Sequence, residues 1–228
     1  MNNNMKQIID YGLIGYKGRL GSEVQLVFSE AGHKLVFTSD IDGKNEKSKP
    51  QVLIDCSLPE AFEENVLLAQ KFSTPFIIAA TGLSDNQLEA LTKLSKNIPV
   101  VQSFNFSVGI QVLLNLTRIA CGLLKDWDVE ITETHHRMKK DKPSGTAKML
   151  KEVFKDKPVN VSSLRLGGVP GDHSVEFGGM GETLKISHHA ISRRTFAEGI
   201  LKSAEFILNK ENGLYSFSDV LFGPENRK

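Results

Sequence analysis

The stretch Gly15-Tyr16-Lys17-Gly18-Arg19-Leu20-Gly21 follows an apolar run at residues 8–14. Behind it, apolar residues recur at helical spacing until Gly32, and a second apolar run at residues 33–38 leads to Asp40. The order of strand, glycine turn, helix, strand and acid is typical of a dinucleotide-binding βαβ unit. Glycine is required in the turn because the backbone bends sharply there and approaches a pyrophosphate at the helix start. A structural βαβ turn without a ligand would carry the same glycines, so this pattern alone leaves that alternative open.

Strand and helix patterns continue to alternate through the first half of the chain. Apolar strands are predicted at residues 52–56, 76–80 and 98–102, with helices at residues 61–72 and 83–95 between them. This alternation predicts an α/β fold, a Rossmann-like doubly wound parallel sheet, in which ligands bind at the carboxyl ends of the strands. The residues that we expect along that rim are Gly15, Tyr16, Lys17, Gly18, Asp40, Ser57, Thr81, Asn105 and Phe106. The hydroxyl residues among them would equally suit ordinary turns and helix caps.

The second half of the chain has a different pattern. An apolar helix is predicted at residues 108–124 and a strand at residues 129–134. Further strands are predicted at residues 164–166, 174–177 and 183–188, without helices between them. Consecutive strands of this kind predict a second, α+β domain with an antiparallel or mixed sheet.

Composition excludes several classes of function. The 28 Lys and Arg residues nearly balance the 27 Asp and Glu residues, so nothing global indicates nucleic-acid binding. The two cysteines give no disulfide framework and no cysteine spacing typical of a metal site. No segment has the features of a signal peptide or the length of a membrane span. We therefore expect a cytoplasmic protein with neither a membrane nor a nucleic-acid partner.

The strand at residues 129–134 leads into a second informative stretch, Glu133-Thr-His-His-Arg-Met-Lys-Lys-Asp-Lys-Pro-Ser-Gly-Thr-Ala147. Its Pro-Ser-Gly-Thr segment predicts a helix start, where Ser144 or Thr146 can cap the first-turn amides and Gly145 lets a ligand approach the backbone. A cationic loop beside a helix start is expected to bind a carboxylate or phosphate. A solvated basic loop that merely caps a helix is the alternative.

Histidine chemistry gives this loop a possible catalytic use. A histidine titrates near neutral pH, so one beside a dinucleotide domain can give a proton as a hydride arrives. His135 and His136 should point to opposite faces of the strand, and Glu133 shares the face of His135, where it could orient the ring or raise its pKa. Lys139 and the helix start at residues 144–146 would hold carboxylates. Because no histidine spacing typical of a zinc site occurs, we expect no metal.

Residues 133–147 match the pattern E-x-H-H-x-x-K-x-D-x-P-S-G-T-A at every fixed position, and thereby resemble the 4-hydroxy-tetrahydrodipicolinate reductase family, formerly called dihydrodipicolinate reductase. The glycine turn is similar to the family's G-x-x-G-R-M-G, with Leu20 in place of Met. Residues 55–59 resemble its D-F-S-x-P, and residues 105–109 its N-F-S-x-G. The resemblance covers essentially the whole chain.

The resemblance implies reduction of 4-hydroxy-tetrahydrodipicolinate to tetrahydrodipicolinate by NADH or NADPH, in lysine and diaminopimelate biosynthesis. It makes His135 the proton donor and Lys139 the second catalytic or substrate-binding group of a site for a small dicarboxylate. Substrate binding is implied for His136, Ser144, Gly145 and Thr146, and cofactor binding also for Arg19, Leu20 and Ala79. The alternatives are a dinucleotide-binding sensor without catalysis and a dehydrogenase of another small anionic substrate.

The resemblance also implies a domain organisation. Residues 1–106 would form the dinucleotide-binding domain, to which the tail at residues 207–228 returns. Residues 107–206 would form the substrate-binding domain, whose sheets join four subunits into a homotetramer.

Two departures from the family pattern concern the cofactor. Many relatives have Gly-Thr-Thr-Gly where this chain has Ala79-Ala80-Thr81-Gly82, and an arginine where Ile41 follows Asp40. A carboxylate repels a 2′-phosphate unless a cation lies between them. We therefore predict a preference for NADH over NADPH, which the cations Lys17, Arg19 and Lys44 could reverse.

Overall fold

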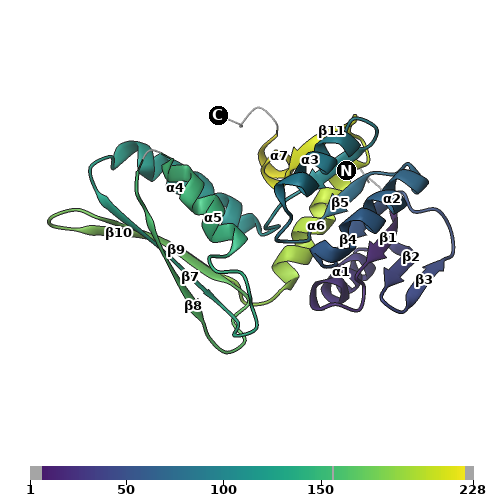
Figure 1. Ribbon diagram of the computed structural model, residues 1–228, viewed down its shortest axis with the longest axis horizontal. Helices are drawn as coiled ribbons and strands as arrows, with labels where there is room; N and C mark the ends of the chain where they lie inside the picture. Colours follow the sequence, from purple (N-terminus) through teal and green to yellow (C-terminus); the bar gives the residue numbers. More distant parts are fainter. Residues whose placement is uncertain (1–6, 156, 224–228) are drawn as a thin grey trace, which may run out of the picture. The chain divides into compact units, whose positions relative to one another are not determined.

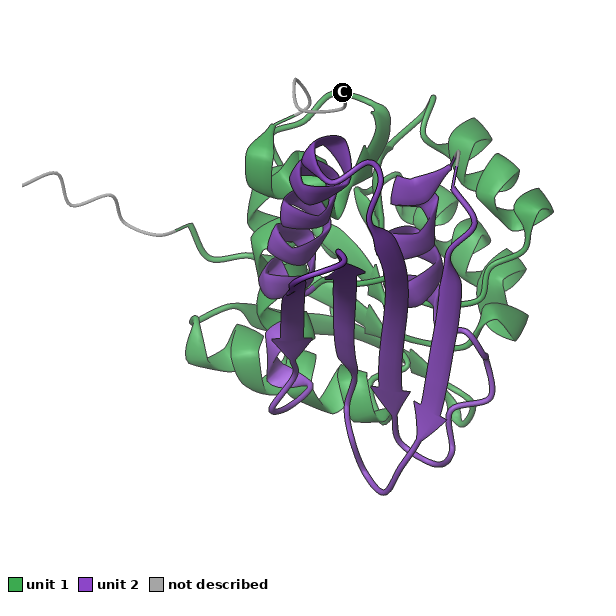
Figure 2. Ribbon diagram, turned by 90° about the vertical axis from the view of Figure 1, so that its left-hand side faces the viewer, with its two compact units in different colours: residues 1–106, 196–228 green, residues 107–195 purple. Residues whose placement is uncertain are grey.

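The computed structural model describes residues 7–155 and 157–223 (Figure 1). The chain divides into two compact units, which Figure 2 distinguishes by colour. Unit 1 contains the described residues up to Phe106 and from Phe196 onwards, and unit 2 contains Ser107–Thr195. The first unit is therefore discontinuous in sequence, and the second is inserted into it.

Unit 1 is built on a sheet whose described strands follow the order β11-β6-β5-β4-β1-β2-β3. All neighbouring strands are parallel except β2 and β3, which form an antiparallel pair. The strands are β1 (Asp10–Ile14), β2 (Lys34–Asp40), β3 (Gly43–Glu46), β4 (Val52–Asp55), β5 (Phe76–Ile78), β6 (Pro99–Gln102) and β11 (Gly213–Ser216). The predicted Rossmann-like α/β architecture is confirmed.

Two apolar cores lie on the two sides of this sheet, because successive residues of a strand point to opposite faces. In β4, Val52 and Ile54 join one core and Leu53 joins the other. The first core contains apolar residues of α1 (Arg19–Glu30), α6 (Arg194–Ile207) and α7 (Phe217–Phe222). The second core contains apolar residues of α2 (Phe62–Phe72), which follows the short helix η1 (Pro59–Ala61), and of α3 (Asp85–Leu94).

Unit 2 contains a mixed sheet of strand order β10-β9-β7-β8, as the sequence predicted. Its strands are β7 (Asp128–His135), β8 (Asn160–Arg165), β9 (Asp172–Gly178) and β10 (Thr183–His189). Only the β7–β8 pair is parallel among the pairs of this described sheet. Figure 1 shows α4 (Val108–Leu123) and α5 (Gly145–Lys151), which continues into η2 (Glu152–Phe154), along one face of the sheet. Apolar residues of these helices and strands form a third core.

Two elements differ from the sequence analysis. Strand β3 was not predicted, because its Gly-Lys-Asn-Glu sequence is exposed throughout and carries no apolar alternation. Helix α6 was placed in the second domain, which was given residues 107–206. In the structure, compact unit 2 ends at Thr195, because the buried face of α6 packs in the first core of unit 1. The described part of the predicted returning tail forms β11 and α7, and β11 pairs with β6.

None of the helices within residues 7–155 and 157–223 combines the length and the apolar character needed to cross a membrane.

Candidate active site

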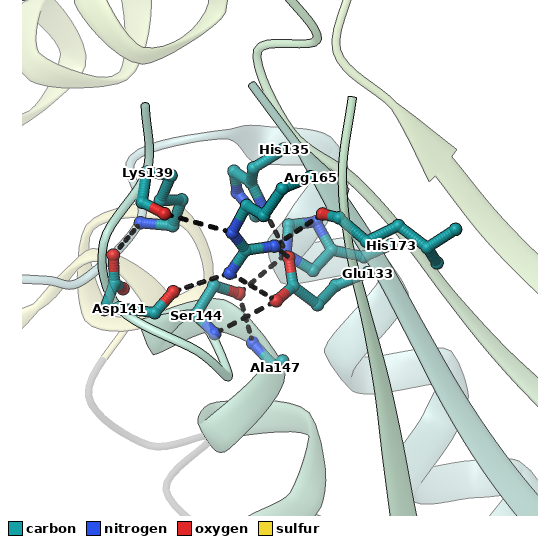
Figure 3. Close-up of polar contacts among 9 residues, drawn as sticks. Glu133, His135, Lys139, Asp141, Ser144, Ala147, Arg165 and His173 are labelled. Carbon is teal, nitrogen blue, oxygen red and sulfur yellow. Dashed lines mark hydrogen bonds and ion pairs between the residues drawn. The ribbon is translucent and has the colours of Figure 1, made fainter. Parts of the chain in front are cut away.

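Strand β7 brings two of the residues singled out in the sequence to the same buried face. Ile131, Glu133 and His135 alternate along the strand, and each is buried. Ile131 packs in the apolar core of unit 2, whereas the two polar residues lie toward the end of the strand. The register of β7 with its neighbours places Arg165 of β8 opposite His135, and His173 of β9 opposite Glu133. Paired residues of adjacent strands share a face, so the four side chains meet (Figure 3).

The carboxylate of Glu133 is the centre of this cluster. Arg165 donates a two-pronged pair of hydrogen bonds, from Nη1 to Oε2 at 3.0 Å and from Nη2 to Oε1 at 2.9 Å. The amide of Ser144 lies 3.4 Å from Oε1, and His135 contacts Oε2 through Nδ1. Burial alone raises the pKa of Glu133, but the hydrogen bonds from Arg165, Ser163 and His135 outweigh it and hold the pKa at about 2. Glu133 is therefore a carboxylate at neutral pH.

His135 is held by its Nδ1 atom, which donates to Glu133. Its other nitrogen, Nε2, lies beside Gly171. The ring is so close to this glycine that a side chain at position 171 would have no room. Burial lowers the pKa of His135, and the charges of Lys139 and Arg165 lower it further, against the opposing effect of Glu133. From the sequence, we expected that Glu133 could raise the pKa of His135. It does contribute in that direction, but burial outweighs it, so the ring is neutral at neutral pH.

His173 completes the buried cluster from β9. Its ring lies edge-on to that of His135, with 5.1 Å between the centroids. Its Nε2 forms a hydrogen bond of 3.3 Å with Ser144 Oγ, and its Nδ1 has no hydrogen-bond partner among the residues that the structure describes. Burial, followed by the charge of His135, lowers the pKa of His173 to about 3. This imidazole is neutral and polar in an otherwise charged cluster.

Arg165 also binds the loop between β7 and α5. Its Nε donates to the backbone carbonyl of Lys139 at 3.2 Å, and its Nη2 donates to that of Asp141 at 2.5 Å. Within the loop, Lys139 Nζ lies 2.7 Å from Asp141 Oδ1. Only 15% of the Lys139 side chain is exposed, so its charge is partly shielded from water. Figure 3 shows Lys139 and Asp141 on one side of the guanidinium and Glu133 on the other.

The start of α5 is capped as the sequence predicted. Ser144 Oγ accepts a hydrogen bond of 3.2 Å from the amide of Ala147. The same hydroxyl contacts His173 and is buried, so it serves the fold of the site. Thr146 is also buried, in the first turn of the helix.

The glycine turn in unit 1 lies between β1 and α1. Gly15 has a φ of +73°, and a Cβ there would lie 2.9 Å from the backbone of Cys56, so only glycine fits. A Cβ on Gly21 would collide with the carbonyl oxygen of Gly15. Gly18 is the N-cap of helix α1 and has no side chain to cap it, which leaves the first-turn amides available to an anion.

The acid predicted to bind a ribose lies beside this turn. Asp40 accepts hydrogen bonds from the amide of Lys17 at 3.0 Å and from that of Ile41 at 2.9 Å. The Lys17 ammonium contacts the carboxylate of Asp42. Lys44 forms an ion pair of 2.6 Å with Glu64. Two of the three cations named as able to favour NADPH are thus already paired with acids.

A buried polar network supports the rim at the end of β4. Asp55 accepts from the amide of Ser57 at 2.8 Å, from its hydroxyl at 2.6 Å and from Asn65 Nδ2 at 2.9 Å. Asn65 Nδ2 also contacts Ser57 Oγ at 2.9 Å. Burial raises the pKa of Asp55, against the effect of these hydrogen bonds. The network fixes Ser57, which the sequence analysis assigned to cofactor binding.

The predicted site residues separate into two groups. Unit 2 brings together His135, His136, Lys139, Ser144, Gly145 and Thr146 around the end of β7 and the start of α5. The cofactor group belongs to unit 1, at the carboxyl ends of its strands, in the loops that follow them and at the start of α1. Its members are Gly15, Tyr16, Lys17, Gly18, Arg19, Leu20, Asp40, Ser57, Ala79, Thr81, Asn105 and Phe106. The ring of Phe106 packs against Phe217 at 5.3 Å, so this residue offers mainly its backbone to a ligand.

Arg165 and the contact of His173 with the cluster were not predicted from the sequence. Each of the two residues lies on a strand, but the sequence around a strand residue does not show that its side chain contacts Glu133. The parallel pairing of β7 with β8, across α5, brings Arg165 into place.

Glu133, His135 and His173 each present a potential metal ligand within 4.8 Å of the others. However, the guanidinium of Arg165 binds both oxygens of Glu133. A divalent cation would have to displace this buried positive charge, so the donor set favours an ion pair over a metal.

Comparison with known proteins identifies the family of the chain. The family model "Dihydrodipicolinate reductase, N-terminus" matches residues 30–106, and "Dihydrodipicolinate reductase, C-terminus" matches residues 109–221. The chain belongs to the dihydrodipicolinate reductase family. The resemblance stated from the sequence motifs is thus confirmed.

Relatives within the dihydrodipicolinate reductase family align along most of the chain. The 4-hydroxy-tetrahydrodipicolinate reductase of Thermosipho africanus is 46% identical, over 92% of this chain and 97% of its own length. That of Rickettsia bellii is 35% identical, over 93% and 94%. Among solved structures, a dipicolinate-bound dihydrodipicolinate reductase from Paenisporosarcina sp. TG-14 aligns with a TM-score of 0.69 at 22% identity, over 94% of this chain and 100% of that chain. This last likeness shows the shared fold.

Proposed function

We propose that the chain is an oxidoreductase that uses NADH or NADPH to reduce 4-hydroxy-tetrahydrodipicolinate to tetrahydrodipicolinate, in lysine and diaminopimelate biosynthesis in the cytoplasm. The observation that carries this proposal is the cluster at the end of β7. The E-x-H-H segment, whose residues gave the family resemblance, folds so that Glu133, His135 and Arg165 are bonded together beside the start of α5. The relatives named 4-hydroxy-tetrahydrodipicolinate reductase align over nearly the whole chain.

The residues of unit 1 fit a nicotinamide dinucleotide. Uncapped amides at the start of α1 suit the pyrophosphate, and the glycine turn lets it approach the backbone. We assign the ribose to Asp40, and the remaining contacts to the loops after β4, β5 and β6, which carry Ser57, Ala79, Thr81, Asn105 and Phe106. When bound, the dihydronicotinamide supplies the hydride.

Charges around the glycine turn support a preference for NADH. Asp40, which we assign to the ribose, and the nearby Asp42 would both repel a 2′-phosphate on that ribose. Lys17 already faces Asp42, and Lys44 faces Glu64, so neither is a free counter-charge. Arg19 is the remaining cation of the three considered. Steady-state rates with both cofactors decide this point, and a tenfold preference for NADPH would contradict it.

We assign the proton transfer to Nε2 of His135. The neutral ring keeps its proton on Nδ1, facing Glu133, so Nε2 must gain a proton before it can donate one. The carboxylate of Glu133 stabilises the resulting imidazolium. A dianionic substrate nearby would act in the same direction, raising the pKa of His135 when it binds.

Substrate carboxylates are assigned to the cationic side of the site. Lys139 provides a shielded ammonium, which would exchange its partner Asp141 for a substrate carboxylate. The start of α5 provides the backbone of Gly145 and the side chain of Thr146. Ser144 contributes by shaping this helix start, and His136 follows β7 directly and is assigned to substrate binding. Electrostatic complementarity of this kind orients a dicarboxylate for hydride transfer.

The first test is spectroscopic. Absorbance at the nicotinamide band should fall when freshly made substrate is added to the protein and NADH. His135→Gln and Lys139→Ala should each lower kcat by about 10²- to 10⁴-fold, while NADH binding changes little. Cofactor binding without turnover would favour a sensor. Near-normal kcat in both variants would show that the roles are wrongly assigned.

We also infer a homotetramer joined through the sheets of unit 2. Apolar side chains of its strands, among them Leu164 on β8 and Leu184 on β10, are 40% and 42% exposed in the single chain. Light scattering during size-exclusion chromatography should give four times the chain mass. Leu184→Glu should lower that mass, and an unchanged tetramer would place the interface elsewhere.

A further inference from the structure

Arg165 is the last residue of β8 and lies opposite His135 in the parallel β7–β8 pair. Its side chain is 14% exposed, and that of its partner Glu133 is fully buried. An ion pair in such a position is costly to desolvate, so it persists only where further hydrogen bonds compensate. Arg165 has these bonds on both sides.

One edge of the guanidinium faces the strand. Nη1 and Nη2 bind the two oxygens of Glu133, whose Oε2 also accepts from Nδ1 of His135. Arg165 therefore fixes the carboxylate that fixes the imidazole. The geometry determines which ring nitrogen of His135 carries the proton in the neutral state, and where Nε2 points.

The other edge faces the loop. Nε and Nη2 bind the carbonyl oxygens of Lys139 and Asp141, and the carboxylate of Asp141 holds the Lys139 ammonium. The backbone and the side chain of Lys139 are thus both placed by groups that Arg165 contacts directly. A lysine at position 165 could not repeat this, because an ammonium lacks the planar fork that binds a carboxylate and two carbonyls at once.

We propose that Arg165 is a positioning residue for the reduction, which holds His135 and Lys139 in a fixed relation through Glu133 and the backbone of the loop. The inference rests on the proposed function, since it concerns the two side chains assigned to catalysis. Arg165 itself is not assigned a contact with the reacting atoms. Misplacement of catalytic groups by about 1 Å can lower a rate by about 100-fold, which sets the expected size of the effect.

Arg165 also keeps Glu133 charged. The titratable and charged groups around this carboxylate are His135 on β7, Arg165 on β8, His173 on β9 and Lys139 in the loop. The hydrogen bonds of Arg165 are the strongest of the influences that lower the pKa of Glu133 against burial. Without them, this pKa rises, and Glu133 becomes protonated on mild acidification. His135 then loses its charged partner.

The experiment compares the whole protein with Arg165→Ala and Arg165→Lys, using Arg118→Ala as the matched control. Arg118 lies on α4, is exposed and donates a hydrogen bond to Asn115. We expect kcat to fall about 100-fold in Arg165→Ala and at least about tenfold in Arg165→Lys. The KM for NADH should stay within about twofold, because the assigned cofactor residues belong to unit 1. Arg118→Ala should match the wild type.

Two further measurements separate positioning from a merely structural role. In Arg165→Ala, the acid limb of the kcat profile should move to higher pH than in the wild type, and adding Glu133→Gln should abolish that shift. Guanidinium ion at about 50 mM should restore part of the kcat of Arg165→Ala, whereas methylammonium should not, since only the former has the planar fork. An equal loss at every pH, without rescue, would overturn the proposal.

Arg165→Lys retains a positive charge beside Glu133, so it carries the test if Arg165→Ala does not fold. Wild-type kcat and pH dependence in Arg165→Lys would overturn the proposal. Absence of turnover in the wild-type protein is a separate result, because it contradicts the proposed function itself.

Discussion

Gly171 lies directly against His135: a Cβ on Gly171 would come 2.9 Å from Nε2 of the imidazole. The glycine also has a φ of +156°, a conformation that other residues rarely adopt. The backbone of the loop before β9 therefore lies directly beside the ring nitrogen that is assigned to proton transfer. Any side chain at position 171 would compete with a substrate for that space.

Gly171→Ala should lower kcat by about tenfold or more, because the added methyl group shifts the ring or covers Nε2. Steady-state kinetics with NADH measure the effect. Gly168→Ala is the matched control from the same loop, since a Cβ there meets no atom within 4 Å. Equal kcat in the two variants would show that the contact with Nε2 has no catalytic consequence.

Replacement of His173 should reduce the sensitivity of the protein to acid. The unfolded chain takes up this proton near the ordinary value of 6.5, whereas the folded chain does so only near 3. The free energy of unfolding therefore falls as the pH drops between these values. The loss is about 2 kcal/mol at about pH 5.

His173→Asn should show a smaller decrease of the melting temperature than the wild type between about pH 7 and about pH 5. Thermal unfolding followed by circular dichroism at several pH values provides the measurement. The melting temperature of each protein at about pH 7 is its own reference, so that any pH-independent change in stability caused by the substitution cancels. Parallel curves for the two proteins would contradict the assigned role of this imidazole.

Asp42→Ala should make the protein more tolerant of NADPH. It removes one carboxylate and releases the ammonium of Lys17, which then becomes a counter-charge for a 2′-phosphate. We expect the ratio of kcat/KM for NADPH to that for NADH to rise about three- to tenfold. Glu46→Ala is the control, because it releases Lys71 from a similar surface pair. If Asp42→Ala and Glu46→Ala raise the ratio equally, the change in net charge explains the effect and the release of Lys17 does not.

Asp55→Asn should weaken both NADH binding and folding. The new amide would place an NH₂ group against the Nδ2 of Asn65, which now donates to Asp55. A lost buried hydrogen bond of this kind costs about 1–3 kcal/mol. The double variant Asp55→Asn/Asn65→Asp exchanges donor and acceptor, and should recover part of the stability and of the KM for NADH. If the double variant is no more stable than Asp55→Asn and binds NADH no better, the lost hydrogen bond to Asn65 is not the cause of the defect.

Local patterns were sufficient to predict the parallel sheet and to single out two groups of candidate site residues. The glycine turn, Asp40 and the stretch around His135 each combine several signals within a few residues, so the sequence alone makes them candidates. Strand β3 has no apolar residue, and consequently no signal for a buried face. Helix α6 has a clear apolar face, but amphipathicity does not say which core that face will join.

The contacts of Arg165 could not be predicted for a different reason. They depend on the register between β7 and β8, which are separated by a loop and α5. An arginine at the end of a strand is ordinarily a surface residue, and only the pairing shows that it meets Glu133. The same holds for His173, whose place opposite Glu133 follows from the antiparallel register of β9. Such cross-strand relations are non-local and leave no periodic trace in the sequence.

The discontinuity of unit 1 affects how the protein emerges from the ribosome. Strands β1 to β6 are synthesised first, yet the apolar face that α6 covers and the edge of β6 that β11 completes remain open until residues 196–216 have been made. An exposed strand edge and an apolar face favour association with other chains. The insertion of unit 2 therefore lengthens the interval during which the nascent sheet of unit 1 keeps an open edge and an exposed apolar face.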